Sequence, residues 1–324
     1  AVSTTCMREG IVLYDKDGQE IWACANVDAR SDDEVAQLVH MNPELEKQIY
    51  RESGQTYALG ALPRLFWVKN KMPEVYEKTA MCTMFNDWLI YKMTGVFSSE
   101  PSNACTTGIF DLKARDWDDQ IAASIGLKTG IFPKISECGT VVAKVGAKGA
   151  AETGLAEGTP VVAGGGDAQL GCVGVGVVDA NQAAIFGGSF WQYEYNTDEA
   201  KTDEHCRVRV NCHSVPGIWQ YEALAFKPGM VMRWYRDAFC QYEKELSKTT
   251  GRDPYDLMNE KAKDIPAGCY GMMCAFSDVM NYISWRHASP MFINFDFDPD
   301  KFNRYTFYRA IMENTAMVTY GRRS

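Results

Sequence analysis

The stretch that decides the fold is VVAGGGDAQLG, residues 161–171. Val161 and Val162 predict a short buried strand, and the apolar segment after Asp167 predicts a helix. A glycine costs about 0.5–1 kcal/mol against alanine inside a regular element, so three in succession indicate a sharp turn or a close approach to the backbone. We therefore predict that Asp167 faces a substrate from the end of a strand. The alternative is that Asp167 is only the N-cap of the helix, a common position for aspartate.

Length and charge limit the function classes. The chain has 324 residues, which is enough for two domains. Its 33 Lys and Arg against 42 Asp and Glu give a net charge of −9. This charge argues against nucleic acid or an anionic membrane as the main partner.

The cysteine pattern indicates a cellular compartment. The chain has 11 cysteines, an odd number, spread over its whole length without a Cys-x-x-Cys pair. Such scatter fits neither a disulfide framework nor a zinc site, so we expect reduced thiols in a cytoplasmic protein. The sequence shows no apolar run long enough for a bilayer and no leader pattern.

Helical and strand patterns alternate along the first half of the chain, which favours α/β layers. Asp17-Gly18 predicts a hairpin between two apolar runs. Ser31 with Glu34 has the spacing of a capping box before a helix. Further helices are predicted over 59–69, over 86–91 with a stop at Gly95, and from an Asp116 cap to Gly126.

The second half predicts a strand at 183–186, a tight turn at 187–189, and a hairpin of 207–212 with 218–224 around Pro216-Gly217. Pro228 predicts a helix start, followed by an apolar stripe on Met230, Val231, Trp234, Tyr235, Ala238 and Phe239. We place the domain break within 178–182, which gives domains 1–178 and 183–324.

No single motif identifies the function. A GxxxxGK[ST] loop and a GxGxxG turn are absent. The four histidines have no metal or triad spacing, and Ser189 lacks the closing glycine of a nucleophile elbow. Taken alone, Arg8-Glu9 reads as a solvated pair, Asp28 as a loop carboxylate, and the Gly-Gly-Ser turn as ordinary loop chemistry.

The order of the motifs is more specific. Read as MREG, ANVDAR, NDWLIYKMTG, PSNACTTGIFDL, RDW, GGGDAQLG and GGSFWQ, nearly the whole chain resembles the FGGY carbohydrate kinases. The resemblance implies a two-domain, actin-like, ribonuclease-H-like α/β fold with substrate and ATP in the cleft between the domains. The MREG and VDAR stretches narrow the resemblance to the branch that phosphorylates the quorum-sensing molecule autoinducer-2 (4,5-dihydroxypentane-2,3-dione).

The resemblance also assigns residues. Asp167 matches the catalytic base, Arg8 and Glu9 match the pair that grips substrate hydroxyls, and Asp28 is carried over as a substrate-side residue. The nucleotide-side residues carried over are Gly187, Gly188, Ser189, Gly229 and Arg233. The implied reaction is ATP-dependent phosphorylation of a primary hydroxyl, with Mg²⁺ on the phosphates.

Two family elements are missing from the sequence: the opening phosphate-binding hairpin and the late adenosine-binding loop. We therefore expect the chain to be incomplete at both ends and inactive by itself. Another ketose or polyol, such as xylulose or glycerol, is an alternative substrate, and a homodimer is one alternative for the assembly. A non-catalytic sugar-binding protein of the same fold and a carboxylate-pair glycosidase are the alternatives from other functional classes.

Overall fold

The computed structural model describes residues 1–26, 28–57, 60–225, 227–276 and 291–321. The chain forms two compact units, one of residues 1–184 and 195–222 and the other of 185–194 and 223–324. Each unit thus contains two separate stretches of the chain. The predicted domain bounds, 1–178 and 183–324, stay a prediction, because these two units are defined by contacts within the folded chain alone.

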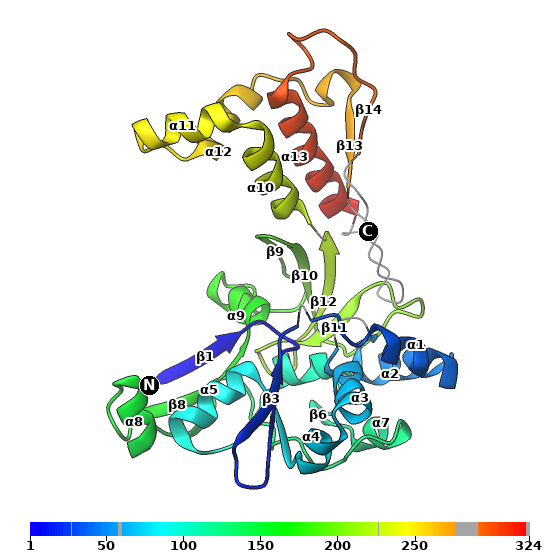
Figure 1. The fold of residues 1–324 in the computed structure, drawn as a ribbon, viewed down its shortest axis with the longest axis vertical. Coiled ribbons are helices and arrows are strands. Elements are labelled where there is room, and N and C mark those ends of the chain that lie inside the picture. The colour runs from blue at the N-terminus through cyan, green and yellow to red at the C-terminus, as the bar shows by residue number, and fades with distance from the viewer. Residues whose placement is uncertain (27, 58–59, 226, 277–290, 322–324) are drawn as a thin grey trace. The chain divides into compact units, whose positions relative to one another are not determined.

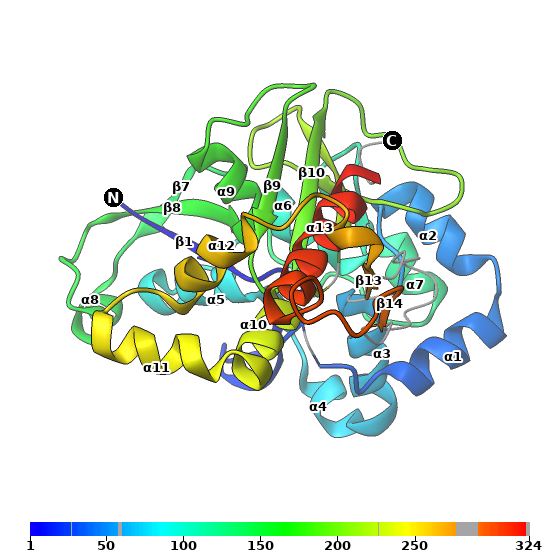
Figure 2. The ribbon, with the colours of Figure 1, turned by 90° about the horizontal axis from the view of Figure 1, so that it is seen from above.

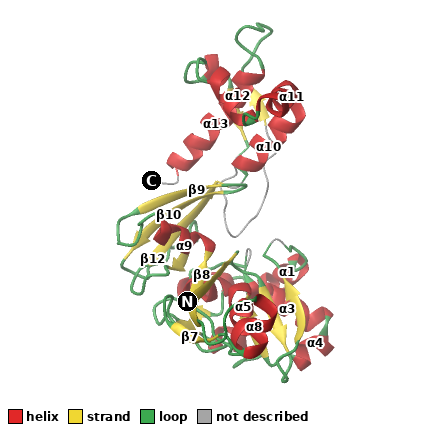
Figure 3. Ribbon diagram, turned by 90° about the vertical axis from the view of Figure 1, so that its left-hand side faces the viewer, coloured by secondary structure: helices red, strands yellow, loops and turns green. Residues whose placement is uncertain are grey.

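A three-stranded sheet in the first unit positions the acidic turn. Strand β1 (Val2–Cys6) runs parallel to β8 (Pro160–Gly166), and β7 (Val141–Lys144) pairs antiparallel with β8 on its other side. Helix α5 (Phe85–Thr94) packs on β1 and β8 and also contacts α8 (Ala147–Thr153). Because β1 and β8 are parallel, their carboxyl ends lie at the same end of the sheet. Figure 3 labels two strands of this sheet, β7 and β8.

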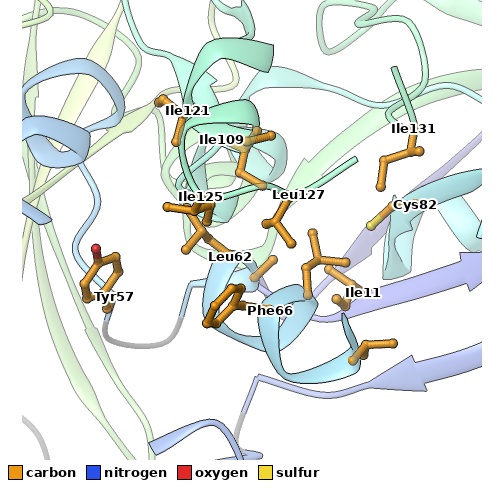
Figure 4. Close-up of a cluster of buried hydrophobic side chains, with 14 of the residues drawn as sticks. Ile11, Tyr57, Leu62, Phe66, Cys82, Ile109, Ile121, Ile125, Leu127 and Ile131 are labelled. Carbon is orange, nitrogen blue, oxygen red and sulfur yellow. The ribbon is translucent and has the colours of Figure 1, made fainter. Parts of the chain in front are cut away.

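The predicted hairpin at Asp17-Gly18 is confirmed. It joins β2 (Ile11–Tyr14) to β3 (Glu20–Cys24), and β4 (Met81–Met84) pairs with the other edge of β2. All four residues of β2 are buried, because helices and strands surround it. The main core of the unit lies there, with Ile11, Leu62, Phe66, Ile109 and Leu127 among its members (Figure 4).

The remaining elements of the first unit connect these sheets. Among them are α1 (Asp32–Met41), α2 (Leu45–Ser53), α3 (Ala61–Lys71), α4 (Pro73–Lys78), α6 (Pro101–Ala104), α7 (Asp119–Ser124), and the strand pair β5 (Phe110–Asp111) and β6 (Asp116–Trp117). The helices expected over 59–69 and 86–91 are confirmed as α3 and α5, and Gly95 ends α5 in the left-handed conformation.

Two predicted helix caps are wrong. The Ser31 side chain makes no capping hydrogen bond at the start of α1. Asp118, and not Asp116, caps α7 by accepting from the N–H of Gln120, because Asp116 is already paired in β6. Ser31 is at the N-cap position of α1 without the bond that the spacing predicts, and the cap of α7 lies two residues later than predicted.

A second sheet has the order β11 (Arg209–Cys212), β12 (Trp219–Ala225), β10 (Trp191–Thr197), β9 (Ala183–Gly187), as Figure 1 shows. The hairpin predicted around Pro216-Gly217 is confirmed, with β11 antiparallel to β12. Arg209 pairs with Glu222 across that hairpin.

The second unit is mainly helical. Its further elements are α10 (Pro228–Phe239), α11 (Gln241–Thr250), α12 (Pro254–Ala262), α13 (Arg304–Gly321), and the antiparallel pair β13 (Met273–Ala275) and β14 (Met291–Ile293). Helices α10 and α12 both pack against α13, drawn in red in Figure 2. Among the described residues, no helix is long and apolar enough to cross a membrane.

The apolar stripe predicted on α10 is only partly a core face. Val231 and Tyr235 are buried in the core of the second unit. Met230, Trp234 and Phe239 are between 39% and 53% exposed. The stripe is therefore wider than the surface that the second unit buries.

Candidate functional site

Asp167 lies where the sequence predicted it, directly after a strand and at the start of a helix. Strand β8 ends at Gly166, and α9 (Asp167–Gly174) begins at the next residue. The N-cap residue is Gly166, so the alternative that Asp167 is itself the N-cap is wrong. The Asp167 carboxylate accepts the N–H of Ala168 at 2.9 Å and is otherwise turned outward, with 60% of the side chain exposed.

The three glycines serve close packing within the protein. A Cβ on Gly164 would lie 1.6 Å from the carbonyl oxygen of Thr4, and a Cβ on Gly166 would lie 2.9 Å from Cγ of Arg8. All three glycines are buried. They let β1 and the Arg8 side chain lie directly against the turn that carries Asp167, rather than opening the main chain to a ligand.

Arg8 reaches Asp167 because of the parallel pairing. Cys6 is in register with Gly166 at the ends of β1 and β8, so the residues after each strand emerge side by side. The Arg8 Nε lies 4.0 Å from the nearer Asp167 carboxylate oxygen. The structure thus brings together the predicted base and the predicted substrate-gripping arginine.

Arg8 and Glu9 are both buried, not solvated. Arg8 Nη2 lies 2.5 Å from Glu222 of β12, and Glu9 accepts from Arg209 of β11 at 2.7 Å. Arg209 also lies 3.5 Å from Glu222 and donates through Nε to Gln55 at 2.7 Å. Two guanidinium groups and two carboxylates therefore balance in charge within one network, which is the condition under which buried charges are tolerated.

Sequence reasoning missed Arg209 and Glu222. Pairing the outer ends of the two predicted strands, 207–212 and 218–224, places residues 209 and 222 opposite each other, as the structure has them. Opposite charges at paired positions of the predicted hairpin were thus visible in the sequence. Their connection to Glu9, 200 positions earlier, was not.

A third buried arginine, Arg64 of α3, links Glu9 to Asp28. Its guanidinium donates to the main-chain carbonyls of Glu9 at 3.0 Å and of Asp28 at 3.3 Å. Glu9 has a φ of 65°, an uncommon conformation for a residue with a side chain, and the bond to its carbonyl supports it. Burial lowers the pKa of Arg64.

The Asp28 carboxylate is engaged by a neighbour. Arg30 binds it through Nε at 2.8 Å and Nη2 at 2.6 Å, and these bonds lower the pKa of Asp28 to about 2. The proposed substrate-side role of Asp28 stays a prediction. The geometry connects Asp28 to the network through its main chain, with the carboxylate held by Arg30.

Asp167 has the electrostatics of a base with increased proton affinity. Desolvation by the surrounding protein raises the pKa of Asp167, although water reaches more than half of the side chain. Arg8 acts in the opposite direction, and the charges of Glu9 and Glu222 add to the increase in the pKa. The carboxylate is thus accessible to a ligand and binds a proton more tightly than an ordinary aspartate.

The second predicted set of residues also comes together, within the second unit. The turn at 187–189 lies against the first turn of α10: a Cβ on Gly229 would lie 1.8 Å from the carbonyl oxygen of Gly188. Met230 N–H donates to the Ser189 carbonyl at 3.4 Å. Arg233 lies one turn further along α10 and is exposed.

This arrangement is of a kind that suits phosphate. A helix N-terminus carries a partial positive charge and main-chain N–H groups, and here it lies beside the turn at 187–189. For a metal ion, the described residues contain no group of three or more His, Cys, Asp or Glu side chains that could hold it.

The comparison with known proteins decides the family. Residues 1–174 match the model of the FGGY family of carbohydrate kinases, N-terminal domain. The chain belongs to the FGGY family of carbohydrate kinases. The expected mixed α/β, actin-like fold is confirmed by solved kinases: the chain resembles xylulose kinase from Rhodospirillum rubrum with a TM-score of 0.82 at 22% identity, covering 98% of this chain and 62% of that one.

A glycerol kinase from Plasmodium falciparum gives a TM-score of 0.79 at 17% identity, over 98% of this chain and 62% of that one. Similarity in sequence is higher to two autoinducer-2 kinases. Those of Enterobacter sp. (strain 638) and Yersinia pestis bv. Antiqua (strain Angola) are each 48% identical to this FGGY chain over 98% of its residues. The chain spans 60% of the length of each of these two relatives.

Proposed function

We propose that this chain carries the substrate side and part of the nucleotide side of an ATP-dependent kinase that phosphorylates a primary hydroxyl of a small sugar-like molecule. The observation that carries the proposal is the exposed Asp167 carboxylate at the start of α9, with the Arg8 Nε 4.0 Å away. The identity of 48% to autoinducer-2 kinases supports autoinducer-2 as the substrate.

Asp167 is the proposed general base. Its carboxylate accepts the proton of the attacking hydroxyl while that oxygen bonds to the γ-phosphorus of ATP and the bond to the β-phosphate oxygen breaks. The raised pKa of Asp167 favours this role, because a stronger base takes the proton earlier in the transfer.

Arg8 and Glu9 are proposed to orient the substrate from one side of the base. Both are held by buried partners, Arg8 by Glu222 and Glu9 by Arg209, so neither has to be ordered when the substrate binds. Such preorganisation fixes which hydroxyl points at Asp167.

The turn at 187–189 and the N-terminus of α10 are the proposed phosphate contacts, with Arg233 as a further cation on the same helix. When bound, ATP supplies the phosphoryl group and Mg²⁺ neutralises part of its charge. The protein residues bind and align these groups.

The proposal is tested by phosphorylation assays on the protein at its natural length. ATP, Mg²⁺ and each of 4,5-dihydroxypentane-2,3-dione, xylulose and glycerol are supplied, and the phosphorylated product is identified by mass spectrometry. We expect the highest kcat/KM for the dione. A higher kcat/KM for xylulose or glycerol would show that this molecule, and not the dione, is the substrate. Binding of all three without ATP consumption would show that the protein is a sugar-binding protein and not a kinase.

A further inference from the structure

A buried hydroxyl contacts the strand that ends at Asp167. Ser102, the second residue of α6, is fully buried, and its Oγ accepts the main-chain N–H of Gly166 at 3.0 Å. Gly166 is the residue directly before Asp167 and the N-cap of α9. A side chain 64 positions earlier thus holds the main chain one residue from the proposed base.

Glu100 sets the direction of this hydrogen bond. Its Oε2 lies 2.6 Å from the Ser102 Oγ and also accepts the Ser102 N–H at 2.7 Å, and its Oε1 accepts the Asn103 N–H at 3.0 Å. A serine hydroxyl has one proton and two lone pairs. Because the proton goes to Glu100, a lone pair is available for Gly166.

Gly165 makes the contact sterically possible. A Cβ at position 165 would lie 3.0 Å from the Ser102 Oγ, so a side chain there would push the hydroxyl away from the strand. On the other side of the turn, Gly166 packs against the Arg8 side chain. Gly166 is therefore held between Ser102 and Arg8.

We propose that Ser102 is a positioning residue for Asp167, which it holds through the N–H of Gly166, with Glu100 orienting the Ser102 hydroxyl. This inference rests on the proposed role of Asp167 as the base. If the Gly166 N–H lost its bond to Ser102, Gly166 would shift and move the Asp167 carboxylate relative to Arg8 and to the substrate hydroxyl. Proton transfer depends on that distance more strongly than ground-state binding does.

The test compares Ser102→Ala with Ser98→Ala in the protein at its natural length. Ser98 is a matched control, since it is also buried but bonds to the Ser136 hydroxyl instead of to the β8–α9 turn. We expect Ser102→Ala to lower kcat about tenfold, because the buried Gly166 N–H loses its acceptor, with the KM for ATP unchanged. A loss no larger than that of Ser98→Ala would overturn the inference.

A double-mutant cycle separates positioning from general loss of packing. Ser102→Ala is added to Asp167→Asn, and kcat is measured at high enzyme concentration. If Ser102 acts through Asp167, the added change lowers kcat less than twofold; the same tenfold loss in both backgrounds contradicts it. If Asp167→Asn alone leaves kcat unchanged, the proposed base itself is wrong, and the inference falls with it.

Ser102→Cys covers the case in which the alanine variant does not fold. A thiol is close in size but a weaker acceptor for the Gly166 N–H. We expect a fall in kcat that again disappears in the Asp167→Asn background. A kcat equal to that of the unchanged protein would overturn the inference.

Discussion

Asp167 and Arg8 have opposite exposures although they lie 4.0 Å apart: the carboxylate is 60% exposed, and the arginine is 4% exposed. A buried cation beside an accessible carboxylate stays fixed while the carboxylate meets a ligand. The division of work that we propose, with Asp167 taking the proton and Arg8 orienting the substrate, follows from this difference.

We expect Asp167→Asn to lower kcat about 10²–10⁴-fold, because the amide keeps the size of the side chain but cannot accept the proton. The KM for ATP should stay within about twofold, since the proposed phosphate contacts lie on other residues. Steady-state kinetics of the protein at its natural length provide the measurement. Asp118→Asn is the control, because Asp118 also lies at a helix start and asparagine caps a helix equally well.

Arg8→Lys should raise the KM for the sugar-like substrate and leave the KM for ATP unchanged. Lysine keeps the positive charge beside Glu222 but loses the planar fork that can contact Glu222 and a substrate hydroxyl together. Titration of each substrate separately shows which KM moves. A change confined to the KM for ATP would reverse the assignment of the two subsites.

At the scale of the element, the turn from β8 to α9 depends on the strand beside it. Gly164 packs on the main chain of β1, and main-chain atoms cannot move aside as the end of a flexible side chain can. The turn thus requires glycine at position 164 because β1 lies so close to β8.

Gly164→Ala should lower the free energy of unfolding by at least about 1–3 kcal/mol, the usual cost of overpacking. Its Cβ would lie 1.6 Å from the Thr4 carbonyl oxygen. Gly174→Ala at the end of α9 is the control, since a Cβ there meets nothing within 4 Å, and alanine favours a helix over glycine. Urea unfolding measures both, and equal stabilities of the two variants would contradict the packing argument.

A buried carboxylate at the start of α5 makes stability depend on pH. Asp87 Oδ2 accepts from the Met84 N–H at 3.0 Å and from Ser99 Oγ at 2.7 Å. Burial, and next the charge of Glu100, raise the pKa of Asp87 well above its ordinary value. The folded state therefore binds this proton more tightly than the unfolded state does.

The sign of the effect follows from linkage. Below about pH 4 both states carry the proton, and the contribution is fully present; it is lost as the pH rises through the raised folded pKa of Asp87. Asp87→Asn should therefore show a smaller fall in the free energy of unfolding between pH 4 and pH 8. Urea titrations at several pH values give both slopes, and an unchanged slope in the variant would exclude Asp87 as the source.

At the scale of the whole molecule, the chain spans 60% of the length of its autoinducer-2 kinase relatives. We expect the 324 residues alone to phosphorylate the substrate at least about 10²-fold more slowly than the protein at its natural length. The reason is that ATP and the substrate hydroxyl would be held less well in line, which removes a large part of the effective molarity. Both proteins are assayed with saturating ATP and substrate. Comparable rates would show that these 324 residues suffice for phosphorylation.

Local pattern determined much of the secondary structure. Asp17-Gly18 and Pro216-Gly217 specify tight turns, and Gly95 ends a helix, because each of these effects arises within a few residues. The strand that leads to Asp167 and the helix that follows it were predictable for the same reason. The sequence order of the motifs also indicated the family, which the match over residues 1–174 confirms.

Only the tertiary structure decided what surrounds Asp167. Arg209, Glu222 and Ser102 are distant from it and from Glu9 in sequence, and their contacts depend on how β1, β8 and the β11–β12 hairpin meet. The two wrong caps, at Ser31 and Asp116, were also outside the reach of local pattern: Ser31 makes no side-chain capping bond, and Asp118 caps α7 instead of Asp116. Turns and helix ends depend on residues that are neighbours in sequence. A buried charge network depends on contacts between distant segments, which no local pattern specifies.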